Sequence, residues 1–206
     1  MDCYPKALEM SIRDNLPVLF FESQASWEEW LKQHHLDSSG IWLKMAKKET
    51  GISTVNYSEA LDSALCFGWI DSQKASFDEQ YWLQRFTPRG PKSRWSKLNC
   101  ERVAALQAEG RMQPEGIRQV ELAKADGRWE AAYHSQRTIA VPDDFLMELE
   151  KNPEAKAFFG TLNSANRYAI LYRIQTAKKP ETRHARILRF IEMLANRQVI
   201  YPSGRK

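Results

Sequence analysis

The segment from Cys66 to Lys97 constrains the fold more than any other part of the chain. It carries three tryptophans and a run of basic side chains, and no acidic residue lies between Glu79 and Glu101. Indole rings are stabilised by burial, whereas guanidinium and ammonium groups need water or an anion. A segment that interleaves the two kinds of side chain therefore predicts an aromatic-lined depression with a positive rim.

Two strands are predicted within this segment. Gly68 ends the preceding helix, and a strand begins at Trp69. The run YWLQRF, from Tyr81 to Phe86, alternates its side chains between two faces, with Arg85 on the face opposite Phe86. We expect the two strands to pair antiparallel, across a connector that is too long to fix their register.

The whole chain predicts an α+β protein, with a small, mostly antiparallel sheet packed with helices and followed by a helical C-terminal unit. Further strands are expected over residues 17–21 and 41–46. Ser26 is expected to cap one helix, and Asn56 with Glu59 forms a capping box for the next. Beyond Pro142 the pattern is helical throughout, over residues 143–152, 153–160, 163–179 and 180–198.

A change in composition marks the expected division into domains. All seven tryptophans lie in the first two thirds of the chain, the last at Trp129, and the remainder is rich in Ala, Leu, Arg, Lys and Glu. We expect one domain over residues 1–134 and a helical module over residues 141–199. The polar segment before Pro142 would separate them.

Composition excludes several classes of protein. With 206 residues and 43% hydrophobic content, the chain can bury one good core and a small helical appendage. The net charge of +4 is too small for a dedicated nucleic-acid-binding protein. No apolar stretch approaches the roughly 20 residues that span a bilayer, and no signal peptide is recognised, so we expect a cytoplasmic protein without membrane insertion.

Metal and cofactor chemistry is not expected. Cys3, Cys66 and Cys100 show no disulfide or metal-binding spacing. His34 and His35 are adjacent, and adjacent side chains on a helix point about 100° apart, which does not suit chelation. The chain also lacks the glycine-rich and catalytic motifs that bind nucleotides or mark known hydrolases.

Several motifs resemble the YdeI/OmpD-associated family, also called the bacteriocin-protection family. CFGWID begins at Cys66, QRFTPR at Gln84, PKSRWS at Pro91 and PETRHARI at Pro180. The resemblance covers nearly the whole chain, and the part from VPDDF to RILRFIEML is similar to the tail module of that family. It implies a YdeI-like first domain, an OmpD-associated type of C-terminal module, and an association with protection against bacteriocins or envelope stress. It implies no reaction and no catalytic residues.

The leading functional hypothesis is a binding protein for a small anionic molecule. Aromatic faces would stack on a planar group while arginines hold its charge. The start of the helix after Ser96 would add backbone N–H donors. The predicted ligand-binding residues are Trp69, Asp71, Trp82, Arg85, Arg89, Lys92, Ser93 and Trp95, with Trp42 as a further wall.

Two other functions stay open, and the sequence does not give the oligomeric state. Asp71 is a candidate general base for a hydrolase or transferase, with Arg85 or Arg89 stabilising an anionic transition state. Equally, Asp71 could neutralise one of these arginines within the fold. The basic C-terminal helices could form a protein or nucleic-acid interaction module, although basic residues on solvated helix sides explain the same pattern.

Overall fold

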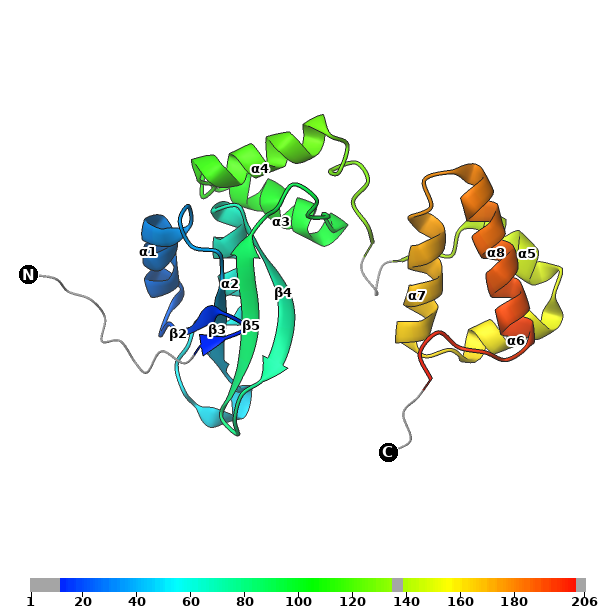
Figure 1. The fold of residues 1–206 in the computed structure, drawn as a ribbon, viewed down its shortest axis with the longest axis horizontal. Helices are drawn as coiled ribbons and strands as arrows, with labels where there is room; N and C mark the ends of the chain where they lie inside the picture. Colours follow the sequence, from blue (N-terminus) through cyan, green and yellow to red (C-terminus); the bar gives the residue numbers. More distant parts are fainter. Residues whose placement is uncertain (1–11, 135–138, 203–206) are drawn as a thin grey trace, which may run out of the picture. The chain divides into compact units, whose positions relative to one another are not determined.

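A computed structural model of the chain describes residues 12–134 and 139–202 (Figure 1). The chain divides into two compact units. The first extends to Trp95 and resumes over Asn99–Ala131, and the second takes in Ser96–Leu98 and the chain from Ala132 onward. The first unit contains the sheet and the second is helical, so the predicted α+β class is confirmed. Part of the polar segment predicted to separate the domains, residues 135–138, lies outside the described residues.

Five strands form one sheet in the order β1-β2-β3-β5-β4. Strands β2 and β3 are parallel and the other neighbours are antiparallel. The predicted antiparallel pairing of β4 with β5 is confirmed, with a register shift between Asp71 and Lys74. The strands are β1 (Ile12–Arg13), β2 (Leu16–Phe20), β3 (Ile41–Ala46), β4 (Trp69–Ser76) and β5 (Tyr81–Pro88).

One face of the sheet packs against helices α1 (Gln24–His34) and α2 (Tyr57–Cys66), and we call it the helical face (Figure 1). Trp27 of α1 is fully buried, and its ring centroid lies 5.8 Å from that of Phe86 and 6.3 Å from that of Trp69. Its indole N–H donates to the carbonyl of Ala60 in α2. Trp27 of α1 therefore contacts both α2 and the sheet, and it holds the two helices against this face.

The opposite face carries Trp42, and we call it the hairpin face because the β1–β2 hairpin lies against it. Directly paired residues project to the same side of a sheet, so Val18, Trp42 and Arg85 share this face. Leu83 also contributes, and the apolar side chains here form a second, smaller core cluster. Strand β3 is therefore buried on both faces rather than on one.

The β1–β2 hairpin turns tightly through Asp14 and Asn15, whose φ angles are 50° and 61°. Positive φ at both central residues is typical of a two-residue hairpin turn, and Asp and Asn tolerate it better than most residues. Arg13 then lies over the Trp42 ring, 4.9 Å from its centroid, and its Nη1 donates to the carbonyl oxygen of Ser76 at 3.4 Å. Since Ser76 ends β4, this hydrogen bond links the first and last strands of the sheet.

Helix caps follow from local sequence. The prediction that Ser26 caps α1 is wrong, because Ser23 is the cap and Ser26 is its partner three residues later in a capping box. The predicted box of Asn56 and Glu59 at the start of α2 is confirmed. Gly68 follows α2 with a φ of 75°, as the predicted helix stop requires.

Two helices complete the first unit, α3 (Lys97–Ala108), of which the part from Asn99 onward belongs to this unit, and α4 (Pro114–Ala125). Pro114 occupies the first turn of α4, as predicted. Gly116 lies directly against the end of α2, where a Cβ atom would stand 2.1 Å from the carbonyl oxygen of Cys66. Only glycine allows the two helices to approach so closely. A short 3₁₀ helix spans Lys48–Thr50.

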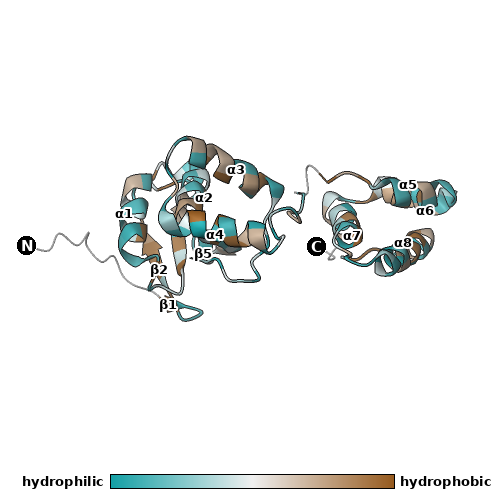
Figure 2. Cartoon of the chain, turned by 90° about the horizontal axis from the view of Figure 1, so that it is seen from above, coloured by the Kyte–Doolittle hydropathy of each residue, from teal (hydrophilic) through white to brown (hydrophobic). Residues whose placement is uncertain are grey.

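The second unit contains the helices α5 (Asp143–Glu150), α6 (Pro153–Thr161), α7 (Ser164–Gln175) and α8 (Pro180–Ala195). Hydrophilic and hydrophobic residues alternate around each of them (Figure 2), and the buried side chains form one core cluster. Ile187 and Leu194 are buried in it, as predicted, but Leu188 is 46% exposed and its assignment to the apolar stripe is wrong. In the part of the chain that the structure describes, no helix has the length and apolarity to cross a membrane.

Candidate functional site

The residues predicted to line one hollow are divided between the two faces of the sheet. Asp71 and Trp82 lie on the helical face, because Asp71 pairs with Phe86, and Trp82 precedes Phe86 by four residues in β5 and so projects to the same side. Arg85 and Trp42 pair across β5 and β3 on the hairpin face. Arg85 is thus separated from Asp71 by the thickness of the sheet.

Trp69 serves the core of the first unit. Its side chain is 1% exposed and its indole N–H donates to the carbonyl of His35 at 3.0 Å. Its ring also meets those of Trp27 and Trp30 edge-on. These contacts fix the start of β4 against the end of α1.

Arg89 and Trp95 form a buried stack that shapes the loop after β5. The Arg89 guanidinium carbon lies 3.5 Å from the Trp95 ring centroid, and Arg89 is 5% exposed. Arg89 also donates from Nη1 to the carbonyl of Arg94 and from its backbone N–H to the carbonyl of Gly68. The guanidinium predicted to face a ligand is therefore used to hold the loop closed on itself.

The rest of the loop also has internal partners. Lys92 is exposed, and the Ser93 hydroxyl accepts the backbone N–H of Gly90 at 3.0 Å. At the start of α3, the N–H of Lys97 donates to the carbonyl of Tyr133 at 2.9 Å. One of the backbone donors expected to bind an anion at this helix start is thus already in use.

Asp71 accepts a hydrogen bond of 2.7 Å from the hydroxyl of Tyr57. Trp82 lies beside this pair, with its centroid 6.4 Å from that of Tyr57, and Lys74 lies 4.3 Å above the Trp82 ring. The partner of the carboxylate is thus a phenol, and Arg85 is not positioned to neutralise it.

On the hairpin face, Arg85 and Trp42 bring two unused donors together. Trp42 is 1% exposed, and neither its Nε1 nor the buried Nε of Arg85 has a hydrogen-bond partner within residues 12–134 and 139–202. A buried N–H without an acceptor costs about 1–3 kcal/mol, so both groups need an explanation, as does Nε1 of Trp95 in the loop after β5, which likewise has no partner among the described residues.

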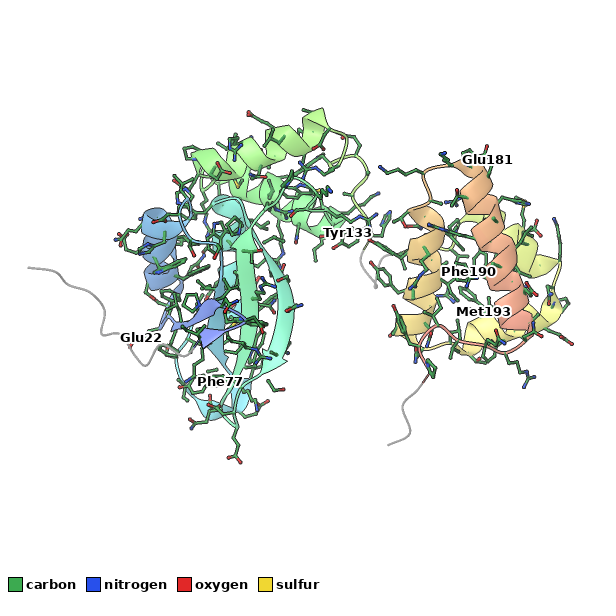
Figure 3. The ribbon with its side chains drawn as sticks, in the orientation of Figure 1. Glu22, Phe77, Tyr133, Glu181, Phe190 and Met193 are labelled. Atoms are coloured by element: carbon green, nitrogen blue, oxygen red, sulfur yellow. The ribbon has the colours of Figure 1, made fainter. Side chains whose placement is uncertain are left out.

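Further cations flank this pair. Arg13 lies over Trp42, while Lys44 lies 4.0 Å from the centroid of Tyr81 and 4.7 Å from that of Phe77, which is at the end of the β4–β5 hairpin (Figure 3). The remaining strand residues on this face carry no negative charge: they are Leu16, Val18, Phe20, Ala46, Ile70, Ala75, Leu83 and Thr87. Positive charge therefore exceeds negative charge among these strand side chains. Two carboxylates moderate it at the hairpin turns: Asp14, which lies 3.9 Å from Arg13 Nε, and Asp78, which accepts the backbone N–H of Tyr81.

Arg13 was not among the predicted site residues. The sequence does contain a signal for the turn beside Arg13. Asp14 and Asn15 lie between Ile12-Arg13 and Leu16, and such a polar pair between two strands is typical of a hairpin turn. The turn alone does not reveal that the hairpin folds back over Trp42, since that depends on the curl of the whole sheet.

Several basic residues of the C-terminal helices hold that unit together. Arg183 forms two hydrogen bonds to the Asp144 carboxylate, at 2.6 and 2.8 Å, and a third to the carbonyl of Ile174. Arg186 donates to the carbonyl of Arg173. These arginines satisfy the end of α7 and the start of α5, which leaves fewer cations for an external partner.

The next candidates are the Cys66 thiol as a nucleophile and clusters of side chains that could bind a metal ion. Cys66 is 3% exposed, and burial raises the pKa of its thiol to about 11, so the thiolate is scarce at neutral pH. Among the described residues, no group of three or more His, Cys, Asp and Glu side chains is arranged to hold a metal ion.

Two families match different parts of the chain. Residues 138–197 match the family described as bacteriocin-protection, YdeI or OmpD-associated, which confirms the suspected family for the C-terminal part. Residues 19–119 match a different family, described as a domain of unknown function (DUF8412). No curated protein and no solved structure gives a significant match.

Proposed function

We propose that this chain, whose residues 138–197 belong to the bacteriocin-protection, YdeI or OmpD-associated family, binds a small anionic ligand on the hairpin face of its sheet. The observation that carries the proposal is the pairing of Arg85 with Trp42, each with a buried N–H that has no acceptor within the described residues. An anion that accepts both hydrogen bonds would remove this cost.

The chemistry of the surrounding side chains favours the same ligand class. A hydrogen bond between a guanidinium and an anionic oxygen contributes about 1.5–3 kcal/mol, more than one between neutral groups. Arg13 and Lys44 add positive charge, and their aromatic partners hold them near this face. Arg85 therefore supplies the main charge, and Trp42 supplies a directional donor.

The proposed site contains Trp42 and Arg85 from the residues predicted from the sequence, and the other predicted residues lie elsewhere. Trp69, Arg89 and Trp95 serve the fold of the first unit. Lys92 lies in the exposed loop and is not part of the proposed site. The alternative in which Asp71 acts as a general base does not use the hairpin face, because Asp71 lies on the other side of the sheet.

We further propose that the protein acts in the cytoplasm and that ligand binding contributes to the protection named in the family description. A bacterial host that expresses the wild-type chain should survive bacteriocin challenge better than one that expresses the Arg85→Gln variant. If the two hosts contain equal amounts of protein and survive equally well, ligand binding through Arg85 does not contribute to protection.

Calorimetric titration with inorganic phosphate, AMP and citrate tests the binding proposal. Arg85→Gln and Lys92→Gln each remove one positive charge, so they form a matched pair. We expect Arg85→Gln to weaken binding at least about tenfold, equivalent to about 1.4 kcal/mol, and Lys92→Gln to change it less than about twofold. Equal losses in both variants, or a loss only with Lys92→Gln, would refute the site.

A further inference from the structure

A concave site separate from the proposed anion site lies in the first unit, where α1 and α2 end and α4 begins. It is a cavity of about 420 Å³, within the range of about 300–1,000 Å³ that is usual for small-molecule sites. His35, Phe67 and Gln113 line it, and Leu36 and Glu115 stand at its sides. None of these residues takes part in the proposed anion site.

His35 lines this cavity, and one of its ring nitrogens can accept a hydrogen bond. Its Nδ1 lies 2.8 Å from the carbonyl oxygen of Leu31, and because a carbonyl can only accept, Nδ1 carries the proton. In the neutral ring, Nε2 then holds a lone pair, and within the described residues no group donates to it. The ring packs edge-on against Phe67, with 5.2 Å between centroids, so its orientation is fixed.

Gln113 presents a second acceptor. Its side-chain amide donates to the carbonyl of Arg111 at 3.0 Å, and this leaves the amide oxygen, Oε1, to accept. Its backbone N–H donates to the carbonyl of Cys66, at the end of α2. Gln113 is thus anchored at two points, and its position relative to the cavity is set by the close approach of α4 to α2.

The charges around the cavity are already paired. Arg118 donates two hydrogen bonds of 2.7 Å to the Glu115 carboxylate, and these bonds lower the pKa of Glu115 below its ordinary value. Lys32 lies 3.4 Å from a carboxylate oxygen of Glu29. The charged side chains that line the cavity therefore have ionic partners of their own, and beside them a ligand meets the ring of His35, the side chain of Gln113 and the apolar surface of Phe67.

We infer that this cavity binds a neutral, planar molecule of nucleobase or aromatic-amide size. Its N–H groups would donate to Nε2 of His35 and Oε1 of Gln113, and its ring would pack on Phe67. Buried hydrogen bonds of this kind discriminate strongly against analogues that lack the donor, because the protein acceptors would then be desolvated without a partner.

Side-chain NMR of the histidines in the full chain tests this inference, with adenine, cytosine and nicotinamide as probes. Adding one of these probes should shift the His35 ring signals in a saturable way and leave those of His34 unchanged, since His34 does not line the cavity. The absence of a saturable His35 shift with all three probes would overturn the inference.

Three variants separate binding from folding. Leu36→Trp should fill the cavity, and because Leu36 is 77% exposed the substitution should not disturb the core. His35→Phe keeps a ring against Phe67 but removes the acceptor, and His34→Phe is its matched neighbour. We expect Leu36→Trp and His35→Phe to raise Kd at least about tenfold and His34→Phe to leave it unchanged. An equal effect of His34→Phe would contradict the inference. The proposed binding of phosphate through Arg85 is independent of this cavity, so either proposal can fail without the other.

Discussion

Trp42 and Arg85 face each other across strands β3 and β5, and each has a buried N–H group without an acceptor in the described part of the chain. Most buried polar groups in folded proteins bond to a protein partner or to ordered water, so these two donors need an acceptor from outside the described residues. The pair also lies under the Arg13 guanidinium of the β1–β2 hairpin and among strand residues without negative charge. These features together distinguish the hairpin face from the rest of the sheet.

Replacing Arg85 by methionine should not destabilise the free protein. The change removes a buried guanidinium N–H that has no partner and keeps an apolar side chain of similar length. We expect the free energy of unfolding, measured in urea, to stay the same or rise by up to about 1 kcal/mol. A loss of more than about 1 kcal/mol would show that Arg85 has a structural partner.

The Tyr57–Asp71 hydrogen bond should contribute modestly to stability. Tyr57 is 39% exposed, so Tyr57→Phe should cost about 0.5–1 kcal/mol. The same substitution should cost less in an Asp71→Ala background, as a double-mutant cycle in urea would show. Additive losses would mean that the two residues do not interact in solution. Neither variant should alter the binding of phosphate.

Two glycines offer a matched test of helix packing. Gly116→Ala would place a Cβ atom 2.1 Å from the carbonyl oxygen of Cys66, so it should force α4 away from α2 and cost about 3 kcal/mol or more. Gly160, in α6, has nothing within 4 Å of an added Cβ, and Gly160→Ala should stabilise the protein by about 0.5–1 kcal/mol. Thermal unfolding of both variants checks the pair, and a neutral Gly116→Ala would contradict the close helix contact.

The Asp144–Arg183 ion pair should make stability pH-dependent. Hydrogen bonds from Arg183 lower the pKa of Asp144 below its ordinary value, so the pair stabilises the fold above the unfolded-state pKa of about 3.9. That contribution is lost as the pH falls through the lower folded-state pKa. Because the pair is partly exposed, we expect about 0.5–1 kcal/mol at pH 7.

Urea unfolding of wild type and Asp144→Asn measures this contribution. The difference between the two proteins should be present at pH 7 and shrink toward zero as the carboxyl is protonated. Asp143→Asn, at an exposed neighbouring position, is the control and should show no such trend. A difference that is constant from pH 7 to pH 2 would contradict the assignment.

The sequence predicts the secondary structure well where the signals are local. Asn56 with Glu59 marks the start of α2, Gly68 marks its end, and Pro114 marks the start of α4. In each case the residue itself favours the local backbone geometry. The error at Ser26 has the same origin, because two serines three residues apart both suit a cap and only packing decides which one is used.

The arrangement of the candidate site was harder to predict because it depends on contacts between distant residues. Alternation along β5 separates Trp82 from Arg85, but the sequence does not say which face the helices cover. Nor does it show that Arg89 is buried on Trp95. A basic, aromatic-rich segment can place its cations in a core or around a ligand, and composition alone does not distinguish the two.

The most direct test of the anion site is the indole N–H spectrum of the full chain during titration with inorganic phosphate, with signals assigned by Trp→Phe substitution. The Nε1–H signal of Trp42 should move in a saturable way, while those of Trp69, which is bonded to a carbonyl, and Trp95, which is in the loop, stay in place. A titration that moves the Trp95 signal and leaves that of Trp42 unchanged would contradict the account and place the anion in the loop after β5.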